Sequence, residues 1–205
     1  MRTGVILPSR GLVHSRTVES FVNNLCGRAW GLYMAHDLPI PDCFNVPTEQ
    51  ALKDGVDQIL FVEEDMVFPD DTFTNMVSMD KPVVSCDYAD RRTGKSLTWR
   101  DKAGNVILTG LGCMLVKREV FEKMEKPYFK RVTAKINSDG SFTELSGGTK
   151  DTSYGTQDVY FCIKIREAGY EIDLLPSANV GHMQVEEYGE DMKNNGVHKI
   201  KTVYL

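Results

Sequence analysis

The sequence lacks long apolar runs and paired cysteines. None of its apolar runs approaches the length of a membrane-spanning helix, and Met1 leads into a short apolar segment without the features of a signal peptide. We therefore expect a cytoplasmic protein without a membrane span. The five cysteines are widely spaced and never form a C-x-x-C pair, so we expect small buried side chains rather than disulfides or a zinc site.

The sequence also lacks internal repeats, low-complexity tracts and linkers that would divide it. Its 205 residues suffice for one α/β domain with a substantial core, whereas two full domains would be cramped. The composition, 41% hydrophobic and 26% charged, is typical of a folded domain in water. We therefore predict a single domain over residues 1–205.

The charges are distributed unevenly. The net charge is -5, yet residues 91–135, here called the basic segment, carry 12 Lys or Arg against four Asp or Glu. One interpretation is a solvated helix face, because "KREVFEKMEK" alternates in sign as exposed helices do. The other is a docking surface for an anionic partner.

Apolar runs rich in β-forming residues predict strands that alternate with helices. The predicted strands cover residues 4–8, 30–35, 58–62 and 82–86. Such alternation indicates an α/β fold, with a mostly parallel, Rossmann-like sheet flanked by helices. In open sheets of this class, ligands bind at the carboxyl ends of the strands.

Helices are predicted between these strands. The first carries apolar residues at helical spacing, namely Val18, Phe21, Val22 and Leu25. The second should begin at Pro47 and end near Asp54, because proline is favoured at the first helical position and Gly55 follows. Asp70 or Asp71 can cap a third helix, whose inward side chains are Phe73, Met76 and Val77.

The second half departs from simple alternation. Residues 110–124 predict a strand that turns into a helix, and residues 131–145 predict a hairpin folded about 138–140. The polar, glycine-rich segment 146–156 is suited to be a lid loop. A helix over about 158–168, a strand to Leu175 and then His182 complete the pattern.

Three acidic residues follow the strand over 58–62 in "QILFVEEDMVFPDD". Glu63, Glu64 and Asp65 are adjacent like charges, which resist burial and repel one another. Such a cluster persists at low cost if it is solvated or if a cation neutralises it. The residues alone leave a solvated loop and a cation site open.

Five motifs together resemble the GT-A glycosyltransferases that use nucleotide sugars, particularly small bacteriophage-type members. In order, the motifs are "ILPSRG", "FVEEDMVFP", "GLGCMLVKREVFEKM", "GTQDVYFCIKIREAGYEI" and "VGHM", and they extend over roughly residues 4–183. The resemblance implies the GT-A form of the Rossmann-like fold. It also implies transfer of a hexose or pentose from a UDP- or GDP-linked sugar to an acceptor hydroxyl, in the host cytoplasm if a phage encodes the protein.

The resemblance implies a cation site for Mn²⁺ or Mg²⁺ on the donor diphosphate. Glu63-Glu64-Asp65 matches the family's D-x-D, with Glu63 where Asp is usual. Asp65 and His182 would be the metal ligands, and Glu63 would lie near the metal or the donor sugar. Oxygen ligands and a neutral imidazole suit such ions. Without the resemblance, a lone histidine is more often an ordinary core or surface residue.

The resemblance also assigns Asp158, at the start of a helix, to the donor sugar. Asp158 would be the catalytic base if the reaction inverts the configuration at the anomeric carbon. If the configuration is retained, Asp158 would bind a sugar or acceptor hydroxyl. Gln157 stands where the family usually has Glu. From the residues alone, a carboxylate at this position is commonly stabilised by the helix dipole.

Further candidates follow from the same family pattern. Donor-binding residues would be Pro8, Ser9 and Arg10, together with Glu63, Glu64 and Asp65, with Arg10 pairing with phosphate. Acceptor or sugar-binding residues would be Asp87, Tyr88, Trp99, Gly110, Gly112 and Gln157. Trp99 could stack on a sugar. Glycines at 110 and 112 would let a sugar approach, although a simple turn explains them nearly as well.

The acceptor is the least constrained part of the hypothesis. Small phage-like size and the basic segment favour a hydroxymethylated DNA base over a cell-surface glycan or protein acceptor. A sugar-nucleotide-binding module without turnover is an alternative, because Gln157 replaces an acid. A nucleotidyltransferase is disfavoured, because the first strand is not followed by a glycine-rich phosphate loop.

Overall fold

The computed structural model describes residues 1–9, 11–36, 38–91, 93–132, 134–137, 142–144, 156–176, 178–186 and 199–203. Its centre is a six-stranded sheet in the order β11-β5-β8-β3-β1-β2. The strands are β1 (Thr3–Ser9), β2 (Trp30–His36), β3 (Gln58–Val62), β5 (Val83–Ser85), β8 (Cys113–Lys117) and β11 (Asp173–Leu174). All run in one direction except β8, which lies antiparallel between β3 and β5. The predicted mostly parallel sheet is therefore confirmed, with one reversed central strand.

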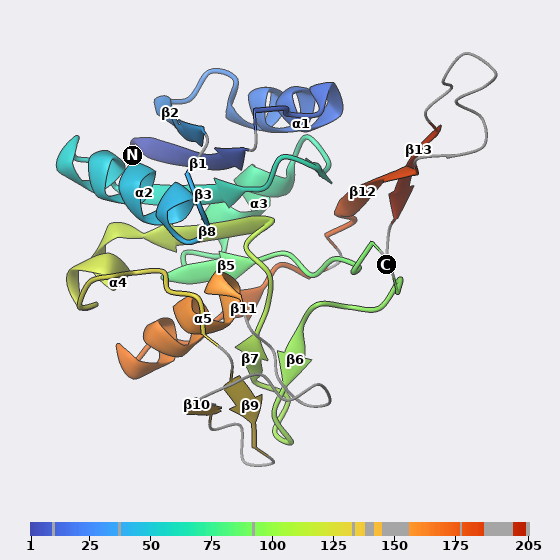
Figure 1. Ribbon diagram of the computed structural model, residues 1–205. Helices are drawn as coiled ribbons and strands as arrows, with labels where there is room; N and C mark the ends of the chain where they lie inside the picture. Colours follow the sequence, from blue (N-terminus) through green and yellow to red (C-terminus); the bar gives the residue numbers. More distant parts are fainter. Residues whose placement is uncertain are drawn as a thin grey trace.

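Helices cover both faces of this sheet (Figure 1). They are α1 (Ser15–Leu25), α2 (Asp42–Lys53), α3 (Thr72–Ser78), α4 (Arg118–Glu122) and α5 (Gln157–Glu167). Side chains alternate along each strand, so Phe61 packs with the α2, α4 and α5 side, whereas its neighbours Leu60 and Val62 pack with the α1 and α3 side. Both faces are thus buried, as expected for a strand that reads as a continuous apolar run.

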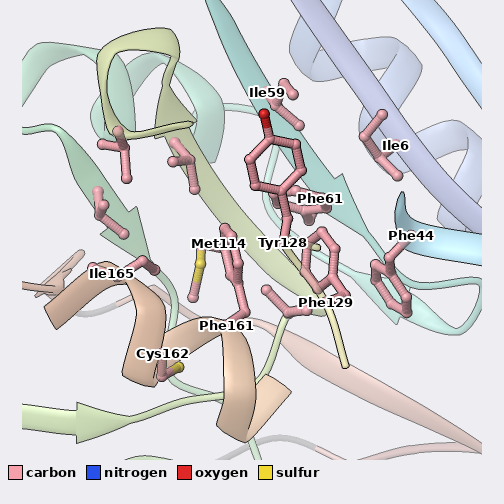
Figure 2. Packing of buried hydrophobic residues seen from close by; sticks show 14 of the residues in the cluster. Ile6, Phe44, Ile59, Phe61, Met114, Tyr128, Phe129, Phe161, Cys162 and Ile165 are labelled. Atoms are coloured by element: carbon pink, nitrogen blue, oxygen red, sulfur yellow. The ribbon is translucent and has the colours of Figure 1, made fainter. Parts of the chain in front are cut away.

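Aromatic rings dominate the core on the α2 and α5 side (Figure 2). Phe61 on β3 contacts Phe44 of α2 at 6.3 Å between ring centroids and Phe161 of α5 at 5.6 Å. Phe129 stacks on Phe161 at 4.5 Å. This cluster fixes α2 and α5 against β3, and so sets where the first residues of α5 lie relative to the end of β3.

Three smaller sheets complete the fold. The strand order β13-β12-β4 joins β13 (Lys199–Val203), β12 (Gly181–Glu186) and β4 (Met66–Val67). The second sheet pairs β6 (Trp99–Arg100) with β7 (Val106–Leu108), and the third pairs β9 (Ala134–Ile136) with β10 (Phe142–Glu144). The predicted hairpin is confirmed by the pairing of β9 with β10. Its turn and most of the expected lid loop lie outside the described residues.

Two helix predictions are wrong in detail. In α1, Val18 and Val22 are 39% and 41% exposed, because the inward face carries polar Thr17, Ser20 and Asn24 beside Phe21 and Leu25. Helix α2 begins at Asp42, so Pro47 lies inside it rather than at its first position. Burial of Cys43 and Phe44 in the preceding turn extends this helix beyond the point that the proline suggests.

Two further expectations also need correction. His182 lies within β12 rather than after the final strand, and β13 follows it. Four of the cysteines are buried, but Cys26 is exposed. Within the described ranges, none of the helices combines the length and apolarity that a membrane crossing requires.

Candidate active site

A cavity of about 310 Å³ opens where β1 and β3 end. The residues that line it are Pro8, Ser9, Leu38, Ile40, Cys43, Phe44, Glu63, Glu64, Asp65, Arg91, Gln157 and His182. It lies at the carboxyl ends of parallel strands, the expected place for a ligand in this fold class. The cavity brings together seven residues that the sequence analysis singled out, from four separate segments of the chain.

The acidic loop is anchored at the mouth of this cavity by backbone hydrogen bonds. The N–H of Glu63 donates to the carbonyl of Gly112 at 3.3 Å, and the N–H of Met66 donates back to the carbonyl of Glu63 at 3.3 Å. The carbonyl of Glu64 accepts from the backbone N–H of His14 and the hydroxyl of Thr17, both at 3.1 Å. The loop is therefore fixed to the residue before β8 and to the start of α1.

Pairing of β4 with β12 brings Asp65 and His182 together. Met66 lies opposite His182 in this pairing, and the N–H of Met183 donates to the carbonyl of Asp65 at 2.8 Å. As a result Nε2 of His182 lies 3.3 Å from Oδ2 of Asp65, with side-chain exposures of 11% and 20%. Two potential metal ligands that are far apart in sequence are thus adjacent in the lining of the cavity.

The other ring nitrogen of His182 determines what Nε2 can do. Nδ1 lies 3.0 Å from the carbonyl oxygen of Ala89, which can only accept, so Nδ1 carries a hydrogen. In the neutral ring Nε2 then presents a lone pair to the carboxylate of Asp65. Two lone pairs at this distance need a proton or a cation between them. A histidine held in this way by a carbonyl is the usual arrangement of a metal-ligating histidine.

Arg91 supplies positive charge at this point. Its Nη1 donates a 2.6 Å hydrogen bond to the same Oδ2 of Asp65. Burial acts to raise the pKa of Asp65, but the hydrogen bond and charge of His182 and the charge of Arg91 outweigh it, so the pKa is lowered. Asp65 is therefore a carboxylate in this site rather than a carboxylic acid.

Glu63 and Asp158 form a second acidic centre. Burial, and then the negative charges of Asp158 and Asp65, raise the pKa of Glu63 well above its usual range. Burial also raises the pKa of Asp158 to about 7, although the amide of Gln157 opposes this shift by donating a 2.7 Å hydrogen bond to Oδ1. Asp158 is not among the residues that line the cavity, but its charge acts on Glu63, which does line it.

Tyr88 is buried against the two glycines that were predicted to admit a sugar. A Cβ atom at Gly110 would lie 2.0 Å from the Tyr88 hydroxyl, and one at Gly112 would lie 2.7 Å from it. The space beside both glycines is therefore occupied by Tyr88, which corrects the interpretation that the small residues leave room for a sugar. The ring of Tyr88 also contacts that of His182 edge-on at 5.6 Å.

The remaining predicted residues are not brought to the cavity. Asp87 accepts hydrogen bonds from the hydroxyls of Ser96 and Thr98, each at 2.8 Å, and so holds the loop that follows β5. Trp99 is an exposed residue of β6 and does not line the cavity. Arg10 lies outside the described residues.

Two groups of lining residues were missed by sequence reasoning. Leu38, Ile40, Cys43 and Phe44 form an apolar wall. The sequence signal for part of this wall was the run "LPIP" over residues 38–41, shortly after the predicted strand over 30–35. Its apolar residues follow neither a helical nor a strand period. Arg91 was noticed only as a member of the basic segment. Nothing in its spacing indicates that it bonds Asp65.

The basic segment does not form a single surface beside the cavity. Lys117 lies opposite Gln58, at the end of β3 remote from Glu63. Lys117 pairs with Asp80 at 2.6 Å, and Arg118 pairs with Glu122 at 2.7 Å. These residues therefore belong to local ion pairs at the opposite end of the strands from the cavity.

Comparison with known proteins supports the fold. No family model matches the sequence, and no curated protein gives a significant match. Among solved structures, the crystal structure of A197 from STIV, a viral protein, is similar with a TM-score of 0.59, over 91% of this chain and 88% of that one. The two sequences are 21% identical. This similarity shows a shared mixed α/β architecture, consistent with a Rossmann-like fold.

Proposed function

We propose that the protein is a cation-dependent glycosyltransferase of the GT-A type, which moves a sugar from a nucleoside diphosphate sugar to an acceptor hydroxyl. The observation that carries this proposal is the pair formed by Asp65 and His182, whose Oδ2 and Nε2 atoms lie 3.3 Å apart. The acidic motif, the distant histidine and the strand-end cavity belong to one site. Each of these three features alone would not indicate a cation site.

The donor set suits Mn²⁺ or Mg²⁺ bound together with phosphate. Asp65 is a carboxylate, and Nδ1 of His182 is held by the carbonyl of Ala89, so Nε2 faces Oδ2 of Asp65. A bound cation would take the place of a proton between these two atoms. The described residues contain no cluster of three or more His, Cys, Asp or Glu that could hold a metal. In this proposal Asp65 and His182 are the two ligands from the chain, and the donor and water fill the other positions, as is common for Mg²⁺-like ions. When bound, such a cation would offset the charge of the departing diphosphate.

Other residues of the cavity have matching roles in this proposal. The apolar wall of Leu38, Ile40 and Phe44 offers a surface for the flat base of the nucleotide, and Pro8 and Ser9 line the same cavity at the end of β1. Gln157 would hold the donor sugar or the acceptor. This arrangement accounts for a cavity that combines an apolar wall with an acidic one.

Asp158 is the proposed base. Its carboxylate would accept the proton of the acceptor hydroxyl if the reaction inverts, and the hydrogen bond from Gln157 orients Oδ1 for that step. A pKa of about 7 suits a group that must be ionised and basic near neutral pH. If the reaction retains configuration, the same carboxylate would bind a sugar hydroxyl.

Calorimetry of donor binding tests the cation site. UDP- and GDP-linked sugars should bind the parent protein only when Mn²⁺ is present. Asp65→Ala or His182→Ala should abolish this cation-dependent binding while the protein stays folded. His36→Ala, at the exposed end of β2, is the matched control and should bind as the parent does. Unchanged donor and Mn²⁺ affinity in both site variants would refute the assignment.

Turnover separates a transferase from a binding module. Asp158→Asn keeps the shape of the side chain but removes its basicity, so transfer should fall by about 10²-fold or more while donor affinity changes little. Mass spectra of products from a panel of nucleotide sugars and acceptors, including hydroxymethylated DNA, would identify the reaction. Cation-dependent binding without transfer or donor hydrolysis would favour the binding module.

A further inference from the structure

Arg91 shares one carboxylate oxygen with the proposed cation site. Oδ2 of Asp65 accepts the 2.6 Å hydrogen bond from Nη1 of Arg91, and the same oxygen lies 3.3 Å from Nε2 of His182. The Arg91 side chain is 45% exposed, whereas that of Asp65 is 20% exposed. The guanidinium group therefore reaches Asp65 from the solvent side of the cavity. It can move away from Asp65 without disturbing the packing of the core.

The segment that carries Arg91 is held independently of this ion pair. The backbone of Asp90 donates to the carbonyl of Lys95 at 2.7 Å, and Oδ1 of Asp90 accepts from both the N–H and the hydroxyl of Thr93, at 2.7 and 3.0 Å. One residue earlier, the carbonyl of Ala89 fixes His182. A single short segment thus orients the histidine and delivers the arginine to Asp65. Movement of the Arg91 side chain need not disturb this turn.

We propose that Arg91 is a built-in counter-ion of Asp65, which leaves that carboxylate when a divalent cation binds and turns toward the phosphates of the donor. This inference rests on the proposed function. A divalent cation ligated by Oδ2 would lie close to a guanidinium held 2.6 Å from the same atom. Like charges at such a distance repel in a partly buried site, so a cation on Oδ2 favours the withdrawal of Arg91 from that atom.

The cavity gives the displaced side chain a suitable destination. Arg91 lines the same cavity as Asp65 and Ser9, where the proposed diphosphate would lie. A planar guanidinium group matches phosphate oxygens well and can donate two parallel hydrogen bonds to them. Arg91 would therefore oppose the binding of the cation alone and favour the binding of cation and nucleotide together. This coupling would make the complete donor complex the preferred state of the site.

Arg91→Gln tests the proposal through two affinities that should change in opposite directions. Without nucleotide, the variant should bind Mn²⁺ about fivefold more tightly than the parent, since a partly exposed ion pair no longer has to be broken. With saturating Mn²⁺, it should bind UDP or GDP about tenfold more weakly, because a charged phosphate contact is lost. Lys95→Gln removes the same charge from the same turn and should change neither affinity. Calorimetry measures both quantities without requiring turnover.

The outcomes distinguish this inference from the function on which it rests. If the parent binds Mn²⁺ and nucleotide but Arg91→Gln leaves both affinities unchanged, or shifts them in the same direction, the counter-ion role is wrong and the proposed function stands. If neither protein binds a divalent cation, both proposals fail. A further test uses the parent protein and so does not require that Arg91→Gln folds. Mg²⁺ should shift the ¹⁵Nε NMR signal of Arg91, assigned with Arg91→Lys, and an unmoved signal at saturating Mg²⁺ would overturn the exchange.

Discussion

The hydroxyl group of Tyr88 accepts a 2.8 Å hydrogen bond from the backbone N–H of Gly112. Tyr88 also bridges to Val180 and contacts the ring of His182, so it links the end of β5, the start of β8 and the strand that carries the proposed metal ligand. Burial, with the negative charges of Glu63 and Asp158, raises the pKa of Tyr88 well above its usual range. Tyr88 therefore stays a neutral phenol. It supports the backbone at Gly112 and the ring of His182.

Gly110→Ala should destabilise the protein by at least about 2 kcal/mol, because the new Cβ would lie 2.0 Å from the Tyr88 hydroxyl and overpack a rigid region. Denaturant unfolding measures the change. Gly31→Ala is the control, since its Cβ would meet only Tyr33 at an ordinary 3.4 Å. Adding Tyr88→Phe should rescue Gly110→Ala only in part, because the ring carbon Cζ would remain 2.8 Å away. A fully stable Gly110→Ala protein would contradict this packing.

Asn24→Ala should reduce the free energy of unfolding by about 1–3 kcal/mol. The buried Asn24 amide donates to the carbonyl of Pro69 and accepts from the N–H of Phe73, both at 2.8 Å. The substitution leaves the N–H of Phe73 unpaired, whereas the carbonyl of Pro69 keeps its hydrogen bond from the N–H of Thr72. Asn23→Ala alters the exposed neighbour and should cost less than about 0.5 kcal/mol. Equal stabilities of the two variants would show that the hydrogen bonds of the Asn24 amide do not hold α1 and α3 together.

Asp158 should make the protein less stable as the pH rises. Its pKa is about 7 in the folded state, above the usual value of an unfolded aspartate, so the folded state holds the proton more tightly. The resulting stabilisation is complete below the unfolded pKa and is lost as the pH rises through about 7. In the presence of a metal chelator, the free energy of unfolding of Asp158→Asn should therefore rise relative to that of the parent between about pH 5 and pH 8. A difference in unfolding free energy that does not vary with pH would contradict the raised pKa.

Hydroxymethylated DNA stays a prediction as the acceptor. If it is correct, DNA binding should weaken steeply with salt, because neutralised phosphates release counterions, whereas donor binding should change far less. Because Arg91 is engaged with Asp65, the test is charge reversal at the exposed residues Lys95 and Lys102, with Lys53→Glu on α2 as the control. The reversed protein should modify DNA more slowly across all sequences. Salt-independent binding and unaltered modification would exclude a nucleic-acid acceptor.

Local patterns predicted the elements of the fold better than their arrangement. Strands such as β3 and β8 were predictable because their apolar residues are continuous and rich in β-forming types. The reversed insertion of β8 between β3 and β5 depends on contacts far apart in sequence, which no periodicity records. Helix α1 was misjudged for a different reason. Hydrophobic spacing cannot detect an inward face on which Asn24 and Ser20 satisfy backbone groups of the loop between β4 and α3.

The candidate site was predictable to a similar extent. The acids after β3 were conspicuous because like charges directly follow a buried strand, but only the family resemblance linked Asp65 to His182. The physical link is the pairing of β4 with β12, two short strands without a strong sequence signal. Arg91 could not be assigned, because its reach to Asp65 depends on a turn closed by Asp90 and Thr93 rather than on any pattern.

The position of β8 also has a consequence for how the chain folds during synthesis. Among the strands that the structure describes, β5 pairs with β8 and β11, both of which follow it in sequence, and β3 pairs with β1 on one side and β8 on the other. Until β8 emerges from the ribosome, β3 therefore presents an open apolar edge and β5 has no partner. Unpaired edges of this kind invite association with other chains. The sheet is therefore completed at its middle, where β8 pairs with β3 on one side and with β5 on the other.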